Sequence, residues 1–225
     1  MRKGTPMFRR LALSCASLAL GISLIGAAPL SPKPQGSELA FVHQIQADLT
    51  QRFATIAEAR RAGYFRYTNE DNTGAISYAN LHWLSSDPAH PSQLWYDVHG
   101  HLLGADFSVP VGDSADAPTL WGVNPARWIH IPAHFHWVVR GAMGKDAYHA
   151  TSLKAFVDAG GDPLFPSATT LVKMGKVKTA SSVKHLFEYP SIWDLIVWIM
   201  PNPNGAFAEK NPLVHPTKNA GMGGM

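Results

Sequence analysis

Three histidines lie close together in the stretch Arg127 to Arg140. In a β-strand successive side chains alternate between faces, so His134 and His136 would share one side while Phe135 and Trp137 face the core. The α-carbons of the two histidines would be about 6.5 Å apart, and two imidazoles can reach one ion across that span with bonds of about 2 Å. The spacing therefore predicts half of a metal site. The alternative is a structural pair that forms hydrogen bonds at a strand edge.

A third ligand has to come from elsewhere in the chain. Extended backbone puts His130 roughly 13 Å from His134, unless the segment around Pro132 bends back. Candidates of suitable chemistry are His130, His149, His185 and Glu188, and also Asp106 and His82.

The only cysteine, Cys15, lies in an apolar N-terminal segment, so a site in the mature chain would use nitrogen and oxygen ligands. Such ligands fit Zn, Cu, Fe, Mn or Ni. The chain has no Gly-x-Ser-x-Gly, Walker, dinucleotide-binding or His-Glu-x-x-His motif, so we expect neither a nucleotide nor a flavin. Catalytic residues stay unknown. A pair of carboxylates on facing strands is a weaker alternative, with Asp97, Asp106, Glu188 and Asp194 as the acids in predicted strands.

The N-terminus has the pattern of a secretory signal. Basic residues before residue 11 precede an uncharged apolar run from Leu11 to Ala28. We expect a signal peptide over residues 1–28, a linker over 29–36 and export to the periplasm or the medium. An uncleaved membrane anchor is the alternative, and it would be the only contact with a membrane.

Four of the 19 basic residues lie in that leader, which leaves 15 basic against 16 acidic residues in the rest of the chain. The body therefore has a net charge of −1, and no basic stripe occurs in it. This composition excludes nucleic acid as an expected partner.

The periodicity of apolar residues predicts an α+β domain over residues 37–211. Its core would be a predominantly antiparallel β-sheet with an N-terminal amphipathic helix and one or two short helices. The helix would be capped by Ser37 and end with Arg60 and Arg61 before Gly63.

Alternating aromatic and β-branched residues predict two hairpins after the helix, over residues 64–83 and 93–109. Asp106 would lie on a strand face with Gly104 and Ser108, and we expect that face to be solvated. Asp146 can cap a short helix over residues 147–159. Strands are expected over 183–189 and 191–200, although a capping-box pattern leaves a helix open for the second. Residues 212–225 read as a flexible tail.

Several segments together resemble a family of uncharacterised exported bacterial proteins. They are Tyr78-Ala79-Asn80, Leu94 to Asp97 with Leu102 to Asp106, His134-Phe135-His136, and Trp198 through Pro201–Phe207 to Asn211-Pro212. The resemblance implies export and a single domain, and it implies no activity.

Three functions remain open on these grounds. The first is an exported protein that binds one divalent transition metal through His134 and His136. The second is a metal-free periplasmic protein for a small ligand or a partner, which Trp121 and Trp128 would contact. The third is a metal-dependent hydrolase or oxygenase.

Overall fold

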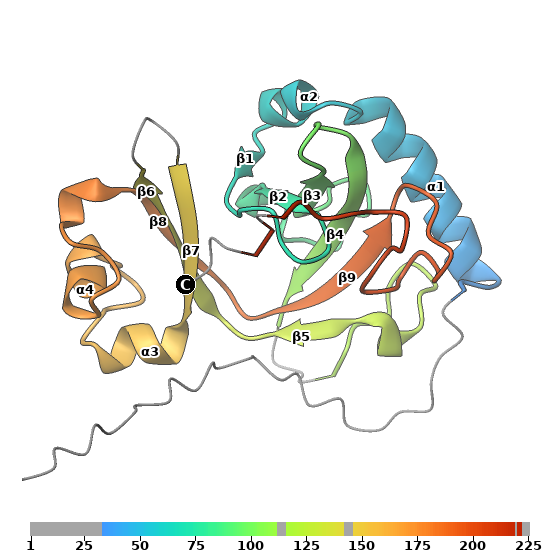
Figure 1. The fold of residues 1–225 in the computed structure, drawn as a ribbon. Helices are drawn as coiled ribbons and strands as arrows, with labels where there is room; N and C mark the ends of the chain where they lie inside the picture. Colours follow the sequence, from blue (N-terminus) through green and yellow to red (C-terminus); the bar gives the residue numbers. More distant parts are fainter. Residues whose placement is uncertain (1–32, 112–115, 142–145, 219, 222–225) are drawn as a thin grey trace, which may run out of the picture.

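The structure, a computed structural model, describes residues 33–111, 116–141, 146–218 and 220–221. In that part of the chain, four α-helices and nine strands in antiparallel sheets form an α+β fold, which confirms the predicted class (Figure 1). The predicted signal peptide over residues 1–28 lies outside the described residues. No helix among those that are described is long and apolar enough to cross a membrane.

The expected N-terminal helix is two helices, α1 (Ser37–Arg52) and α2 (Ile56–Arg61). The chain leaves the helical conformation at Phe53, and Thr55 starts α2 with a capping box in which Thr55 and Glu58 satisfy each other's backbone N–H groups. The prediction of one continuous helix was wrong because the apolar spacing continues through this break. Ser37 is not the cap of α1 either, since Gly36 takes that position and the Ser37 hydroxyl donates to the carbonyl of Gly122.

The larger sheet has six strands in the order β1-β2-β3-β4-β9-β5, all antiparallel. Both predicted hairpins are present in it. Its strands are β1 (Phe65–Arg66), β2 (Ile76–Ala79), β3 (Gln93–Tyr96), β4 (Leu102–Pro110), β5 (Ile129–Ile131) and β9 (Ile192–Trp198). The short helical turns η1 (Leu81–Trp83) and η2 (Pro125–Arg127) lie in the connections.

The smaller sheet has the order β7-β6-β8, with β6 (His134–Arg140) between β7 (Asp146–Ser152) and β8 (Val183–Tyr189). The predicted helix over residues 147–159 was wrong in its first half, because those residues pair with β6 along the whole of β7. Only α3 (Leu153–Asp158) is helical, and Ser152 caps it. A helix that the sequence reading missed, α4 (Ala168–Lys173), follows, and η4 (Ala180–Ser182) leads into β8.

One long two-stranded ribbon joins the two sheets. The strands β5 and β6 are separated only by Pro132 and Ala133, and β8 and β9 only by Pro190 and Ser191. Ile131 pairs with Ile192 on one side of these connections, and His134 pairs with Tyr189 on the other. The ribbon therefore bends at these two connections, each of which contains a proline, and passes from the large sheet into the small one (Figure 1).

The layers follow from this bend. The helix α1 covers one face of the large sheet, where Leu94, Phe107 and Val197 are buried with residues of α1. The helices α3 and α4 cover the outer face of the small sheet, around Phe135 and Trp137. The inner face of the small sheet, which carries His134 and His136, is turned toward the β1 end of the large sheet.

The described residues beyond Pro212 lie on the loop between β1 and β2, and the flexibility expected for residues 212–225 stays a prediction. The backbone N–H of Thr217 donates to the Glu70 carboxylate (2.7 Å), and the N–H of Gly221 donates to the Glu70 carbonyl (2.8 Å). Val214 packs beside Trp95 and Trp198. Glu70 is thus the hydrogen-bond partner of these C-terminal residues, a contact that their composition does not predict.

The capping box at the start of α2 can be tested directly. We expect Thr55→Ala to lower the free energy of unfolding by about 1 kcal/mol, because the first turn of α2 loses its side-chain acceptor. Urea unfolding measures this change. Thr50→Ala, at an exposed position inside α1, is the control and should be neutral or slightly stabilising. Equal loss in the two variants would contradict the assignment of the cap.

Candidate functional site

The two histidines of the His-x-His motif lie on the same face of β6, as strand alternation predicts. Their ring centroids are 4.8 Å apart and the ring planes make an angle of 68°. Two imidazoles bound to one tetrahedral ion would have their centroids about 5 Å apart, given metal–nitrogen bonds of about 2 Å. The distance between the rings is therefore the one that a shared ion requires.

Aromatic rings surround the pair. The ring of His136 meets the edge of Tyr67 at 4.7 Å and stacks near Phe187 at 5.6 Å, and the ring of His134 stacks on Tyr189 at 5.5 Å. Tyr67 comes from the segment after β1, and Phe187 and Tyr189 come from β8. The neighbours of the motif are thus distant in sequence, which is why the sequence alone did not identify them.

Both imidazoles are held in the neutral form. Burial lowers the pKa of His136 to about 3, and burial also lowers the pKa of His134. The Nδ1 atom of His134 lies 2.8 Å from the carbonyl oxygen of Pro132, which can only accept, so Nδ1 carries the proton. The Nε2 atom of His134 therefore keeps a free lone pair. A backbone carbonyl on the second ring nitrogen is a common support for a metal-binding histidine.

The structure does not bring a third predicted ligand to the pair. His130 lies on β5 in the large sheet, where its Nε2 is 2.9 Å from the Ser191 hydroxyl. The ribbon does bend at Pro132, but the bend carries His130 into the other sheet. Glu188 pairs with Phe135, so it lies on the outer face of the small sheet.

The remaining candidates are also placed apart from the two imidazoles. His149 pairs with Trp137 and stacks on its indole at 5.3 Å, and His185 shares the inner face with Val138 farther along β8. His82 is exposed on η1, and Asp106 is buried in the large sheet. Among the described residues, no three His, Cys, Asp or Glu side chains form a group that could hold a metal ion.

The two tryptophans proposed for ligand contact serve in packing. Trp128 is buried in the core beneath α1. Trp121 stacks on Phe41 with ring centroids 5.3 Å apart, and its indole N–H donates to the carbonyl of Ser86. Neither indole lines any of the cavities described below.

A buried chain of polar side chains, which sequence reasoning missed, runs from the large sheet to the histidines. In this polar chain the Ser108 hydroxyl donates to the Asp194 carboxylate (2.6 Å) and lies 2.6 Å from the Ser92 hydroxyl. Gln93 donates to the Tyr189 hydroxyl (3.2 Å) and accepts a hydrogen bond from Tyr67. Tyr67 then contacts His136, so the chain connects both sheets.

The two acids of the polar chain, Asp106 and Asp194, form a hydrogen bond with each other. Asp106 is 6% exposed and Asp194 3%, so the expectation of a solvated face at Asp106 was wrong. Tyr67 and Tyr189 lie against that face, and a single strand pattern cannot show such a cover. The sequence did contain one sign of this burial, the strand alternation that puts Asp106 on one face with Gly104 and Ser108. The glycine leaves room for Trp95, because a Cβ at Gly104 would clash with the indole, and the indole N–H donates to Asp106.

The two carboxyl groups share a proton. Burial, and then the charge of Asp194, hold the pKa of Asp106 well above its usual range, while burial raises the pKa of Asp194 to about 6. Asp106 Oδ1 is buried and accepts no hydrogen bond from any described residue, which agrees with a carboxyl group that keeps its proton. The centre of the large sheet thus holds one negative charge instead of two.

Two cavities open on the inner face of the small sheet. A cavity of about 340 Å³ borders His136, Tyr67, Tyr148 and His149. A cleft of about 870 Å³ lies farther along the same face, between β1 and α2 on one side and β7 and β8 on the other. Tyr148 lines both spaces, and they are the concave surfaces nearest to the polar chain.

Comparison with known proteins gives no guide to the use of these spaces. No protein-family model, no curated protein and no solved structure matches the chain.

The shared proton predicts a pH dependence of stability. The folded state keeps a proton on Asp106 at pH values where the unfolded chain has lost it, so the free energy of unfolding falls as pH rises above about 4. The histidines, with lowered pKa values, act in the opposite direction below about pH 6.5. Above that pH the effect of Asp106 remains, at no more than about 1.4 kcal/mol per pH unit.

Asp106→Asn should remove this slope, because an amide can donate to Asp194 and accept from Trp95 at any pH. We expect the stability of the variant relative to the wild type to increase between pH 6.5 and 9, as followed by urea unfolding. Asp162→Asn, on an exposed loop, is the control and should parallel the wild type. Parallel curves for Asp106→Asn and wild type would show that the two acids do not share a proton.

Proposed function

We propose that the protein is exported and binds one small organic molecule in the cleft between its two sheets. The observation that carries this proposal is the 870 Å³ cleft itself, whose volume is within the range of small-molecule sites, roughly 300 to 1,000 Å³. The proposal of export rests on the signal pattern of residues 1–28.

The walls of the cleft have the composition of a ligand site. Aromatic and aliphatic side chains line it from three separate elements, with Phe65 on β1, Tyr148 on β7 and Phe187 on β8. Phe65 and Phe187 meet edge to face at 5.4 Å, and Phe65 is still 37% exposed. An apolar surface that stays open beside polar groups favours a ligand with an apolar or aromatic body.

The neutral fluorescent probe phenylnaphthylamine tests this function. We expect the wild type to bind it and to enhance its fluorescence, because the probe has an aromatic body and no charge. His185→Trp should weaken binding by at least about tenfold, since His185 lies at an exposed position that lines the cleft and an indole there would fill it.

The matched control is His101→Trp, the same exchange on the exposed turn before β4. It should bind the probe as the wild type does. Binding that is unaffected by His185→Trp would place the probe elsewhere, and absence of binding in the wild type would overturn the proposal.

A second candidate function is the binding of a divalent transition metal by His134 and His136. The ring separation of 4.8 Å and the free Nε2 lone pair of His134 favour it. With two protein ligands, water or a small molecule would have to complete the coordination, and the cavity beside His136 provides the space. Neutral imidazoles suit Zn and Cu(II) best among the expected metals. A metal-dependent hydrolase or oxygenase, the third function considered from the sequence, would depend on the same bound ion.

Elemental analysis of the tag-free protein after exposure to Zn or Cu(II) tests this candidate. We expect about one ion per chain, lost in the His134→Ala, His136→Ala variant. The control is His149→Ala with His185→Ala, which removes two histidines of the same sheet and should leave the ion bound. Equal metal content in both double variants would rule out the pair as its ligands.

A further inference from the structure

We infer that the ligand of the cleft is an organic anion, with a carboxylate, sulfonate or phosphate group on an apolar or aromatic body. This inference rests on the proposed binding function and names the class of molecule. It comes from the charges that line the cleft.

Three basic side chains line the cleft, Arg60 from α2, Arg66 from β1 and Lys184 from β8, against the single acid Asp146. The formal charge of the lining is therefore +2 with His185 neutral. The body of the chain has a net charge of −1, so this concentration of positive charge is local. Clefts lined by one sign of charge attract small ions of the opposite sign.

The pairing of these groups shows which charges are free to meet a ligand. Lys184 donates to both oxygens of Asp146, at 2.9 and 2.7 Å, so these two charges largely cancel. The Arg66 guanidinium lies over the ring of Tyr148 at 4.8 Å, and its Nε donates to the carbonyl of Thr68. Neither contact neutralises the charge of Arg66, and its other nitrogens have no partner among the described residues.

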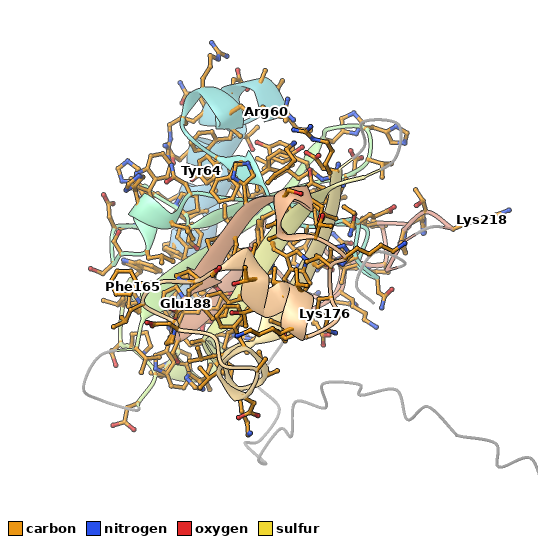
Figure 2. The ribbon with its side chains drawn as sticks, turned by 90° about the vertical axis from the view of Figure 1, so that its left-hand side faces the viewer. Arg60, Tyr64, Phe165, Lys176, Glu188 and Lys218 are labelled. Carbon is orange, nitrogen blue, oxygen red and sulfur yellow. The ribbon has the colours of Figure 1, made fainter. Side chains whose placement is uncertain are left out.

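The side chain of Arg60 makes no hydrogen bond or ion pair with any residue that the structure describes, and it lines the α2 end of the cleft together with Tyr64 (both are labelled in Figure 2). Its neighbour Arg61, by contrast, is directed back onto its own helix, where its Nε lies 3.4 Å from the carbonyl of Ala57. The guanidinium of Arg60 can therefore form a bidentate contact with an anionic group, while the aromatic walls hold the body of the ligand.

Two probes with the same aromatic framework separate charge from shape. Phenylnaphthylamine is neutral, and anilinonaphthalene sulfonate carries one negative charge. We expect the sulfonate to bind the wild type more tightly, by roughly tenfold, with an affinity that falls as salt is added. The affinity of the neutral probe should not depend on salt.

Substitution of Arg60 then locates the charge. Arg60→Gln should weaken binding of the sulfonate by roughly fivefold, and Arg60→Glu should weaken it further, while the affinity for phenylnaphthylamine should change much less. Arg61→Gln removes the same charge from the adjacent position on α2 and should have little effect at physiological salt. Competition by benzoate and by phenyl phosphate distinguishes a carboxylate from a phosphate ligand.

The results separate this inference from the function on which it rests. If both probes bind equally and Arg60→Gln changes neither affinity, the cleft binds small molecules but does not select anions, and the inference is wrong. If neither probe binds, the proposed function itself fails. If Arg61→Gln weakens binding of the sulfonate as much as Arg60→Gln does, the loss of affinity comes from the overall charge of the protein, and Arg60 does not contact the anion.

Discussion

A single antiparallel ribbon bends out of one sheet and into another at two short connections that each contain a proline, and the arrangement of the molecule follows from that bend. Pro132 and Pro190 lack a backbone N–H, so neither can continue the ladder of hydrogen bonds where it stands. The strands resume after two residues on each side, with Ile131 paired to Ile192 and His134 paired to Tyr189. The small sheet is thereby turned across the polar face of the large one.

This turn converts a polar sheet face into an interior. Ser108, Asp106 and Asp194 would be acceptable on a solvated surface, and burial is tolerable only because each finds a partner. Nearly all of these buried polar groups form hydrogen bonds. Their partners are the neutral carboxyl group of Asp106, the hydroxyls of Ser92 and Ser108, and the amide of Gln93. Tyr189 belongs to the small sheet, so the same hydrogen bonds also fix the position of that sheet.

Local patterns in the sequence were enough for most of the strands and for the shared face of His134 and His136. Both hairpins followed from a change of period that depends on neighbouring residues only, and the last strand followed from a run of buried apolar residues. The break between α1 and α2 also has a local cause, the capping box of Thr55 and Glu58. It was missed because the helical spacing of apolar residues continues across the break. For residues 147–152, pairing with β6 overrode a helix-like composition.

What the sequence could not supply was the partnership between distant segments. The aromatic residues around the histidines come from the segment after β1 (Tyr67) and from β8 (Phe187 and Tyr189). No spacing along the chain predicts that these segments come into contact. The cleft has the same origin, because its cations come from α2, β1 and β8. Both surfaces are formed by separate elements that the bend of the ribbon brings together, so their residues can be identified only in the folded molecule.

The equal length of the two connections at the bend has a consequence for how this protein can vary. Each connection has two residues. Ile131 and Ile192 lie on the polar face of the large sheet, while His134 and Tyr189 lie on the inner face of the small sheet, so odd and even positions exchange sides at the bend and the length of each connection sets which side chains face inward. Insertion or loss of one residue beside Pro132 would exchange the two faces of β6, placing Phe135 and Trp137 against Tyr67 and the histidines against α3 and α4. Changes of chain length should therefore be far less tolerated at these two short connections than at the loops around them.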